Sequence, residues 1–310
     1  MLDADTFLIT LYVEVDEFCK RRTLPPRPGP TPDLWPAEAL TLALFSRWSA
    51  FRSERSFFRY AQQRLRGYFP RLPHRTQFNR QMRALSEEVT AFFLFSAERL
   101  GAHEELVQAL DSTALPTRHH KRRGLGWLAG EADIGYSGRL GWYEGFRLLG
   151  AVTPEGVLTG FGFAPASTND YPLAETFFAL RRQPQKGYFA AVGKAARVYL
   201  ADSGFAGQHV AARWEADYRA HVVAPPQRNR PGQKRAWPRA VRRWVASQRQ
   251  IVETVFGTLL NCFGMARERP HERAGFQVRL AASAAMHNFC IWLNRQLGRP
   301  NLAFADLCVL

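Results

Sequence analysis

Three acidic residues stand in local settings that suit carboxylates holding a metal ion. Asp111 and Asp202 each follow a short apolar run typical of a buried strand, and Glu253 lies within the helical stretch 249–256. Two strand ends and one helix can bring three carboxylates to a single point. Carboxylate oxygens are the ligands that hard divalent cations such as Mg²⁺ or Mn²⁺ prefer. The sequence therefore predicts a metal-dependent catalytic centre.

Each of these acidic residues also has a simpler explanation, because an Asp at a strand end is often a turn or cap residue. A fourth one, Asp170, follows a strand and precedes a helix, and we predict that it is the N-cap of the helix beginning at Tyr171. Arg249 lies four residues before Glu253 and so shares one helix face with it. That arginine could orient the carboxylate or clamp a phosphate, or the two could form a solvent-exposed pair.

The composition points to a polyanionic substrate. The 310 residues carry a formal net charge of +15, and the sequence pI is about 10.3. A hydrophobic fraction of 46% is enough for a folded core, so a disordered basic tail is excluded. A charge this large favours nucleic acid first and an anionic membrane surface second. Together with the predicted metal centre, it indicates metal-dependent chemistry on a nucleic-acid phosphodiester.

The expected localisation is cytoplasmic, in association with the nucleoid. The four cysteines are scattered without paired spacing, which favours reduced thiols over a disulfide framework or a zinc site. The first residues lack the basic region of a signal peptide, and no apolar run reaches membrane-spanning length. We therefore expect no membrane partner.

The first third of the chain reads as a series of helices, interrupted by the Pro-rich segment 24–36. Within it, residues 73–76 lead into a short basic helix at 77–86 that bears Arg80 and Arg83. This is the pattern of a helix-turn-helix recognition helix, and it fits equally well a helical bundle with a basic exposed face.

The centre of the chain changes to strand character. A turn-rich segment, 153–156, joins two predicted strands as an antiparallel hairpin. The expected strands cover 106–111, 145–152, 157–163, 197–202 and 220–224, and the expected helices cover 171–182, 206–217, 244–263 and 276–297. The order β-β-β-α-β-α-β-α is that of an RNase H-like domain. The predicted fold class is α/β, an RNase H-like mixed sheet with flanking helices, preceded by an all-helical N-terminal domain.

Three short motifs resemble those of the DDE transposases of bacterial insertion sequences. They are Leu110–Thr113, Tyr199–Phe205 and the pair Arg249-x-x-x-Glu253, in this order and on the expected elements. Segments 69–79, 162–170 and 286–289 are also similar to that family, so the resemblance extends from about residue 65 to residue 297. Many members carry a Tyr three residues before the Arg and a Lys seven residues after the Glu, whereas Ala246 and Leu260 stand at these positions here.

The resemblance implies a site, its cofactors and a reaction. Asp111 would bridge two Mg²⁺ (or Mn²⁺) ions, Asp202 would complete one ion site and Glu253 the other. The reaction would be cleavage at insertion-sequence ends, followed by transfer of the freed strand into target DNA. The partners would be double-stranded DNA, as terminal inverted repeats and as target, and a second copy of the chain in a synaptic homodimer. A nuclease that cuts without joining, or an inactive or domesticated DNA-binding relative, is the alternative.

The resemblance also implies a domain organisation. Residues 1–105 would form the helical DNA-binding domain, 106–298 the catalytic domain with 225–243 as a basic insertion-like segment, and 299–310 a C-terminal tail. The side chains expected to contact DNA are basic, with one aromatic exception: Arg75, Arg80, Arg83, Arg118, Lys121, Arg122, Arg123, Lys234, Arg235, Trp237, Arg239 and Arg249. Trp237 could stack on a base or anchor the core, whereas Trp244 is expected to be a core anchor.

Overall fold

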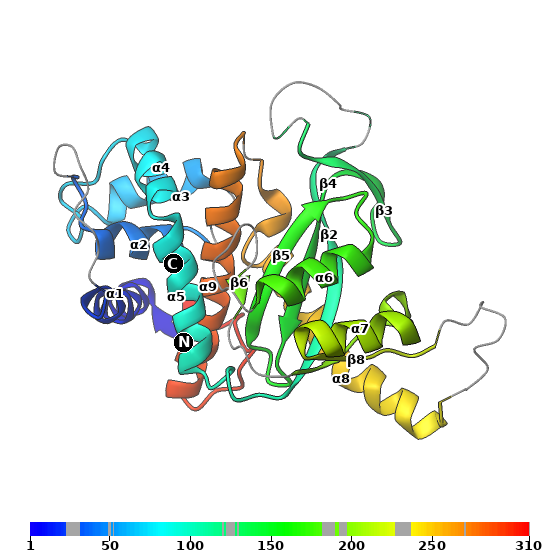
Figure 1. Cartoon of the computed structure of the whole chain (residues 1–310). Coiled ribbons are helices and arrows are strands. Elements are labelled where there is room, and N and C mark those ends of the chain that lie inside the picture. Colours follow the sequence, from blue (N-terminus) through cyan, green and yellow to red (C-terminus); the bar gives the residue numbers. More distant parts are fainter. Residues whose placement is uncertain are drawn as a thin grey trace. The chain divides into compact units, whose positions relative to one another are not determined.

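The computed structural model describes residues 1–22, 32–48, 51, 53–119, 121, 128, 130–181, 190–191, 197–226, 237–269 and 271–309. These residues form two compact units (Figure 1). One unit combines residues 1–96 with 259–310, and the other spans residues 97–258. The first is helical and the second contains the large sheet.

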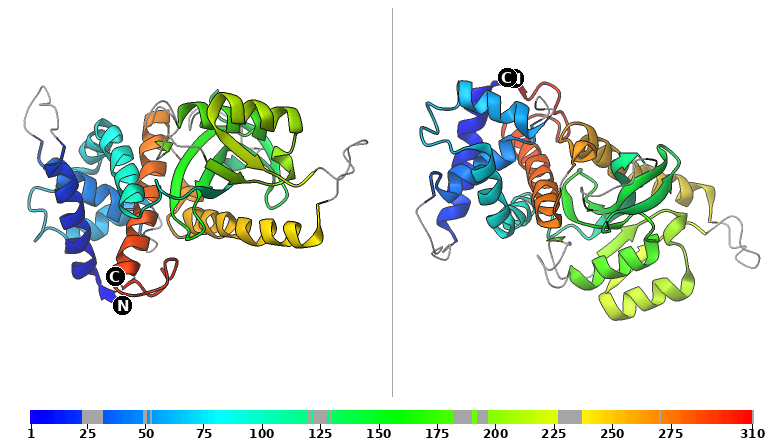
Figure 2. Two further views of the ribbon diagram at one scale, coloured as in Figure 1. Left: turned by 60° about the horizontal axis from the view of Figure 1, so that its bottom comes forward. Right: turned by 90° about the horizontal axis from the view of Figure 1, so that it is seen from above.

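The helical unit is built from both ends of the chain. Its helices are α1 (Ala4–Lys20), α2 (Pro36–Phe45), α3 (Glu54–Arg64), α4 (Arg75–Ala84), most of α5 (Ser86–Arg99), the 3₁₀ helix η2 (Met265–Arg267) and α9 (Arg273–Gln296). The two chain ends lie together (Figure 2), because β1 (Leu2–Asp3) pairs in parallel with β9 (Cys308–Val309). No helix in the described part of the chain is long and apolar enough to cross a membrane.

The last helix of the chain, α9, is buried within the helical unit. Every residue from Leu280 to Ile291 is buried, including the polar residues Ser283, His287 and Asn288. A helix that is apolar around its circumference has to be enclosed by other elements, and α9 packs against α2 and α4. The compact units therefore do not follow the linear division expected from the sequence, which placed this helix with the sheet.

The large sheet is mixed. Its strands are β2 (Val107–His119), β3 (Asp133–Ser137), β4 (Gly141–Val152), β5 (Leu158–Pro165), β6 (Ala190–Ala191), β7 (Arg197–Leu200) and β8 (Ala220–Val223). The order across the sheet is β6-β5-β4-β2-β7-β8, and β3 pairs with β4. Neighbours are antiparallel from β6 to β2 and parallel from β2 to β8. This arrangement confirms the predicted RNase H-like mixed sheet with a helical region before it.

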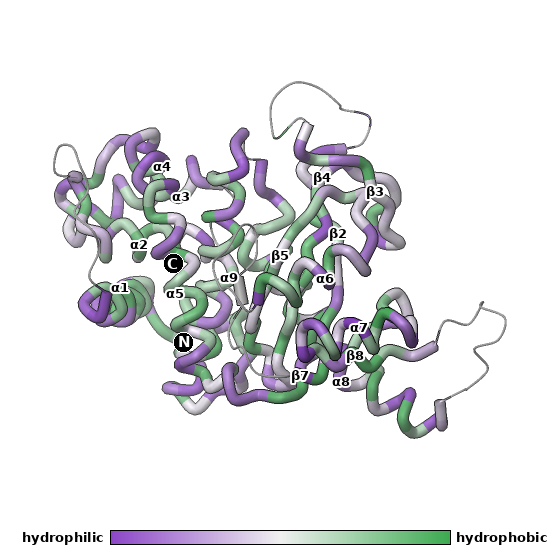
Figure 3. Tube along the Cα trace, in the orientation of Figure 1, coloured by the Kyte–Doolittle hydropathy of each residue, from purple (hydrophilic) through white to green (hydrophobic). Residues whose placement is uncertain are grey.

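Helices cover both faces of the sheet (Figure 2). On one face, α6 (Asp170–Leu180) and α7 (Gln208–Tyr218) share a core with Leu110 of β2 and Leu149 of β4. On the other face lies α8 (Arg239–Asn261), an amphipathic helix that carries both hydrophilic and hydrophobic residues along its length (Figure 3). Its Phe256 lies so close to Gly150 that a Cβ there would be 2.9 Å from the ring. Gly150 is therefore required for α8 to approach the sheet.

Several sequence-based boundaries were wrong, and two strands of the large sheet were missed. The first strand does not end at Asp111 but continues to His119, so Asp111 lies inside β2. The strands β3 and β6 were not predicted. The acidic helix α8 begins at Arg239 instead of Trp244, and it therefore includes basic residues that were assigned to the preceding segment.

Candidate active site

The register of two parallel strands brings Asp111 and Asp202 side by side. Ala109 of β2 lies opposite Leu200 of β7. Asp111 and Asp202 each follow two residues later in the sequence. Neighbouring strands lie about 4.8 Å apart, so the carboxylates fall within range of each other's charge. The structure thus places Asp111 within β2 and Asp202 directly after the adjacent strand β7, and their role as metal ligands stays a prediction.

The side chain of Asp111 lies on the α8 face of the sheet. Its neighbour Leu110 belongs to the core under α6 and α7, and successive residues of a strand point to opposite faces. From α8, Arg249 donates through Nη2 to Asp111 Oδ2 at 3.0 Å, and the backbone amide of Ser112 donates to Oδ1 at 2.7 Å. The ion pair is largely shielded, with 16% of the Arg249 side chain and 18% of the Asp111 side chain exposed.

Burial raises the pKa of the Asp111 carboxyl from 3.8 to about 6. The Arg249 guanidinium and the Ser112 amide lower this pKa, and the charges of Asp202 and Asp170 raise it further. A carboxylate that is costly to ionise gains much from a cation in contact with it. The electrostatics of Asp111 are therefore those of a site that favours additional positive charge.

Asp202 is fixed by a tight turn directly after β7. Its Oδ1 accepts a hydrogen bond of 2.7 Å from the amide of Gly204, within the 3₁₀ helix η1 (Ser203–Phe205). A Cβ on Gly204 would lie 2.8 Å from that oxygen. The glycine two residues after Asp202 is thus required for the carboxylate to hold this position.

Asp170 belongs to the same site, and its predicted role as an N-cap was wrong. Asn169 occupies the N-cap position of α6, and Asp170 is the first residue of that helix. Its Oδ1 accepts from Ser112 Oγ at 2.6 Å and from Arg147 Nη1 at 2.8 Å. Asp170 therefore ties β2 and β4 to the start of α6 next to Asp111. Strand alternation could have indicated this, since Ser112 must point away from Asp111 and towards α6.

Glu253 lies on the neighbouring helix, one turn beyond Arg249. Residues four apart share one helix face, and Arg249 on that face reaches Asp111. The Glu253 side chain is exposed. Within the described residues, no three His, Cys, Asp or Glu side chains lie close enough together to hold a metal ion. Asp202 and Asp170 are near enough to Asp111 for their charges to act on it, whereas Glu253 has an exposed side chain on α8.

The candidate DNA contacts differ in exposure. Arg118 is buried and pairs with Glu144 at 3.3 Å, which does not suit a contact to DNA. Arg75 is exposed and pairs with Glu54, and the half-buried Arg83 pairs with Glu272. Arg80, Lys121 and Arg239 are exposed. Arg122, Arg123, Lys234 and Arg235 lie outside the described residues.

A cavity of about 520 Å³ lies where β7 and β8 end. Trp237 is half-buried and lines it, together with Phe205, Gln208, His221 and Pro226. In open α/β sheets, ligands bind at the carboxyl ends of the strands, and Phe205 is separated from Asp202 by only two residues. The prediction that Trp244 anchors the core was wrong, because 52% of this residue is exposed.

Comparison with known proteins identifies the family. A family model described as the transposase DDE domain matches residues 102–289, which is more than half of the chain. The protein therefore belongs to the transposase DDE domain family, and with it to a class of enzymes that act on DNA. No curated protein and no solved structure gives a significant match. The matched range contains all the acidic residues of the site, as well as Arg147 and Arg249.

Proposed function

We propose that the protein is a DNA transposase that cleaves insertion-sequence ends and transfers the freed strand into target DNA. The observation that carries the proposal is the convergence of Asp111 and Asp202 on adjacent strands of an RNase H-like sheet, with Arg249 of α8 against Asp111. Membership of the transposase DDE domain family supports the same function.

The donor set fits divalent cations. Asp111 and Asp202 offer hard carboxylate oxygens, and burial makes the charge of Asp111 costly without a compensating cation. In this proposal Asp111, Asp202 and Glu253 of α8 would together hold two Mg²⁺ or Mn²⁺ ions. The ions would supply an activated water, neutralise the developing phosphate charge and stabilise the leaving oxygen.

The chemistry requires no covalent link to the protein. In the first step, a water oxygen forms a bond to phosphorus at the element end while the bond to the 3′ oxygen breaks, which leaves a 3′-hydroxyl and a 5′-phosphate. In the second step, that 3′-hydroxyl attacks a target phosphodiester and displaces the target's own 3′ oxygen. Arg249 is suited to hold Asp111 or a phosphate oxygen in place through both steps.

The beginning of α8, the helix that carries Arg249, supports DNA binding. Its first turns expose Arg239, Arg242 and Arg243 around Trp244 and Val241, which are 52% and 41% exposed. Guanidinium groups bind backbone phosphates, and an exposed indole can stack on a base. We propose that this surface holds double-stranded DNA, as terminal inverted repeats or as target, within a homodimeric complex.

The test uses a labelled duplex that carries the inverted repeats flanking this gene, with supercoiled plasmid as target and Mg²⁺ as cofactor. Cleavage and joining should fall at least a hundredfold in Asp111→Asn, Asp202→Asn and Glu253→Gln, while duplex binding persists. Asp217→Asn is the matched control, because this Asp is exposed on α7 and outside the site. Normal cleavage by Glu253→Gln would remove that residue from the proposal, and normal cleavage by Asp111→Asn would overturn it.

There are two alternatives, a nuclease that cuts without joining and an inactive DNA-binding relative, and the exposed position of Glu253 favours the second. The same assay separates these possibilities. Wild-type protein that produces 3′-hydroxyl ends but no joined product is a nuclease, and protein that binds the duplex without cutting it in Mg²⁺ or Mn²⁺ is an inactive relative.

A further inference from the structure

The first turn of α6 contacts both segments of the chain that carry the acidic residues of the site. Its first residue, Asp170, accepts a hydrogen bond from Ser112 Oγ of β2 at 2.6 Å. Its second residue, Tyr171, donates through its hydroxyl group to the carbonyl of Ala206, which directly follows η1. Because β2 and the turn after β7 carry the two candidate metal ligands, one helical turn joins both supports of the site.

On the side of β2, Ser112 bonds to two acidic residues at once. Its backbone amide donates to Asp111 Oδ1 at 2.7 Å, while its hydroxyl group donates to Asp170. Arg147 of β4 donates to the same Asp170 oxygen at 2.8 Å, and both side chains of this ion pair are largely shielded. The ion pair fixes the Asp170 carboxylate. Asp170 in turn holds Ser112, whose amide orients the Asp111 carboxylate.

On the side of β7, the turn after Asp202 is enclosed by the same two residues of α6. A Cβ on Gly204 would lie 2.8 Å from Asp202 Oδ1 and 3.4 Å from Asp170 Oδ2, so both carboxylates approach this glycine. The Tyr171 ring packs against Trp214 of α7 with 5.8 Å between ring centroids, which holds its hydroxyl group against the end of the turn. The Gly204 amide that donates to Asp202 therefore lies in a turn whose position α6 fixes.

We propose that the first turn of α6 is a clamp that sets the spacing between the Asp111 and Asp202 carboxylates. Asp170 and Tyr171 are its positioning residues, and neither is a metal ligand. Asp170 is reached from Ser112, whose side chain points to the face of the sheet opposite that of Asp111. The inference rests on the proposed function, because the clamp acts on the metal centre proposed there. Groups that orient metal-binding carboxylates typically contribute about 10–100-fold to metal affinity.

The test measures Mn²⁺ binding by the full-length protein at pH 8, from the electron paramagnetic resonance signal of the free ion. Ser112→Ala removes the hydroxyl group that reaches Asp170, and Tyr171→Phe removes the one that reaches Ala206. Each variant should bind Mn²⁺ about tenfold more weakly than wild type. The double variant should also lose about tenfold instead of about a hundredfold, because releasing one end of a clamp already frees the spacing.

Thr176→Val is the matched control, since it removes an exposed hydroxyl group of α6 that donates to the carbonyl of Pro172 in the same helix. It should bind Mn²⁺ as wild type does. Asp111→Asn should abolish binding, which places the ion at the proposed centre. Urea unfolding of the metal-free proteins is the second readout. A purely structural role would lower the unfolding midpoint of Ser112→Ala and Tyr171→Phe without changing the Mn²⁺ affinity of the folded protein.

Wild-type Mn²⁺ affinity in Ser112→Ala or in Tyr171→Phe, with binding lost in Asp111→Asn, would overturn the clamp and leave the proposed metal centre intact. A loss of about a hundredfold in the double variant would refute it as well, since the two residues would then act independently. Absence of Mn²⁺ binding by wild type, or binding that survives in Asp111→Asn, would contradict the proposed metal centre itself and the clamp with it.

Discussion

At the scale of single residues, Asp111 is the acidic residue that Arg249 contacts and the one whose ionisation burial makes costly. Its carboxylate is buried, receives Arg249 and the Ser112 amide, and still has a pKa raised to about 6 because desolvation outweighs these partners. Residues whose folded environment opposes their charge are typical of functional sites. A bound cation would offset the cost of ionising the buried carboxyl group, which is consistent with a role for Asp111 in binding a metal ion.

We predict that Asp111→Asn stabilises the metal-free protein by about 1–3 kcal/mol at pH 8. The pKa raised from 3.8 to about 6 already includes the favourable pair with Arg249, so ionisation of Asp111 still costs the folded state about 3 kcal/mol despite that pair. The folded state binds the extra proton between about pH 4 and 6, so wild-type stability falls as pH rises through this window and the gain from the variant grows with it. The amide that replaces the carboxyl group in the variant is neutral throughout.

The measurement is thermal or urea unfolding of wild type, Asp111→Asn and the exposed control Asp217→Asn between pH 4.5 and 8, with chelator present. The advantage of Asp111→Asn should shrink towards pH 4.5 and be absent from the control. A variant less stable than wild type at pH 8 would show that Asp111 carries no such cost.

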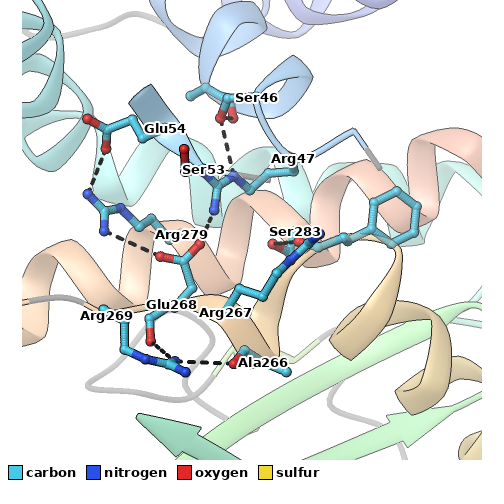
Figure 4. A network of polar contacts seen from close by, with 12 residues as sticks. Ser46, Arg47, Ser53, Glu54, Ala266, Arg267, Glu268, Arg269, Arg279 and Ser283 are labelled. Atoms are coloured by element: carbon cyan, nitrogen blue, oxygen red, sulfur yellow. Dashed lines mark hydrogen bonds and ion pairs between the residues drawn. The ribbon is translucent and has the colours of Figure 1, made fainter. Parts of the chain in front are cut away.

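At the scale of elements, the helical unit is tied together by pairs that join distant parts of the chain. Arg279 of α9 reaches Glu54 at the start of α3, and Glu268 beside η2 reaches Arg47 after α2 (Figure 4). Removing one partner of a shielded ion pair leaves the other charge uncompensated, which costs far more than breaking an exposed pair. The position of η2 against α2 and α9 therefore depends on the Glu268 carboxylate.

Glu268→Gln should lower the free energy of unfolding by about 3–5 kcal/mol, since it leaves both Arg47 and Arg279 without their shared carboxylate. The matched control is Glu272→Gln, whose carboxylate is 63% exposed and pairs with Arg83. Urea unfolding should place the control within about 1 kcal/mol of wild type. Similar losses for both variants would mean that the network around Glu268 is no more than a set of surface pairs.

The segment before α8 carries the second prediction at this scale. Trp237 lines the cavity at the ends of β7 and β8, where it could stack on a base or fill the core. We predict that Trp237→Ala lowers cleavage of element ends at least tenfold with little change in melting temperature, because stacking on a base is worth about 1–3 kcal/mol. A 2-aminopurine placed near the scissile phosphate should brighten with wild type and less with the variant. A large drop in melting temperature with unchanged cleavage would assign Trp237 to the core.

Most of the order of elements along the chain, and the placement of Asp111 and Asp202 on or directly after strands, could be predicted, because apolar runs and turn residues report local structure directly. The continuation of β2 beyond Asp111 could not be predicted, since its next residues include Ser112, Thr113 and Pro116, and the register shifts between Pro116 and Arg118. The start of α8 could not be predicted either, because its arginine-rich first turns lack apolar residues at helical spacing. The pair between Glu54 and Arg279 joins residues 225 apart, and no local pattern records such a contact.

At the scale of the whole molecule, the helical unit needs both ends of the chain. The buried helix α9 packs on α2 and α4, and the strand β9 pairs with β1. A chain that ends after the N-terminal helices would expose the apolar surfaces that α9 covers, and uncovered apolar area is the largest loss a small domain can suffer.

A fragment of residues 1–105 should therefore show helical signal without a cooperative melting transition, whereas the full chain melts cooperatively. Circular dichroism between 10 and 90 °C decides between the two. If the fragment melts cooperatively near the temperature of the full chain, the N-terminal helices form a domain of their own.

The central claim is that Asp111 and Asp202 hold the metal used in DNA cleavage, and a change of ligand chemistry at Asp202 tests it most directly. A carboxylate suits Mg²⁺, whereas a thiolate favours softer ions. Asp202→Cys should cut the labelled element end at under about 1% of the wild-type rate in Mg²⁺, and Mn²⁺ or Cd²⁺ should restore a measurable part of that rate. The exposed control Asp217→Cys should keep the wild-type preference for Mg²⁺. Cleavage by Asp202→Cys at the wild-type rate in Mg²⁺ would show that Asp202 is not a metal ligand and would contradict the account.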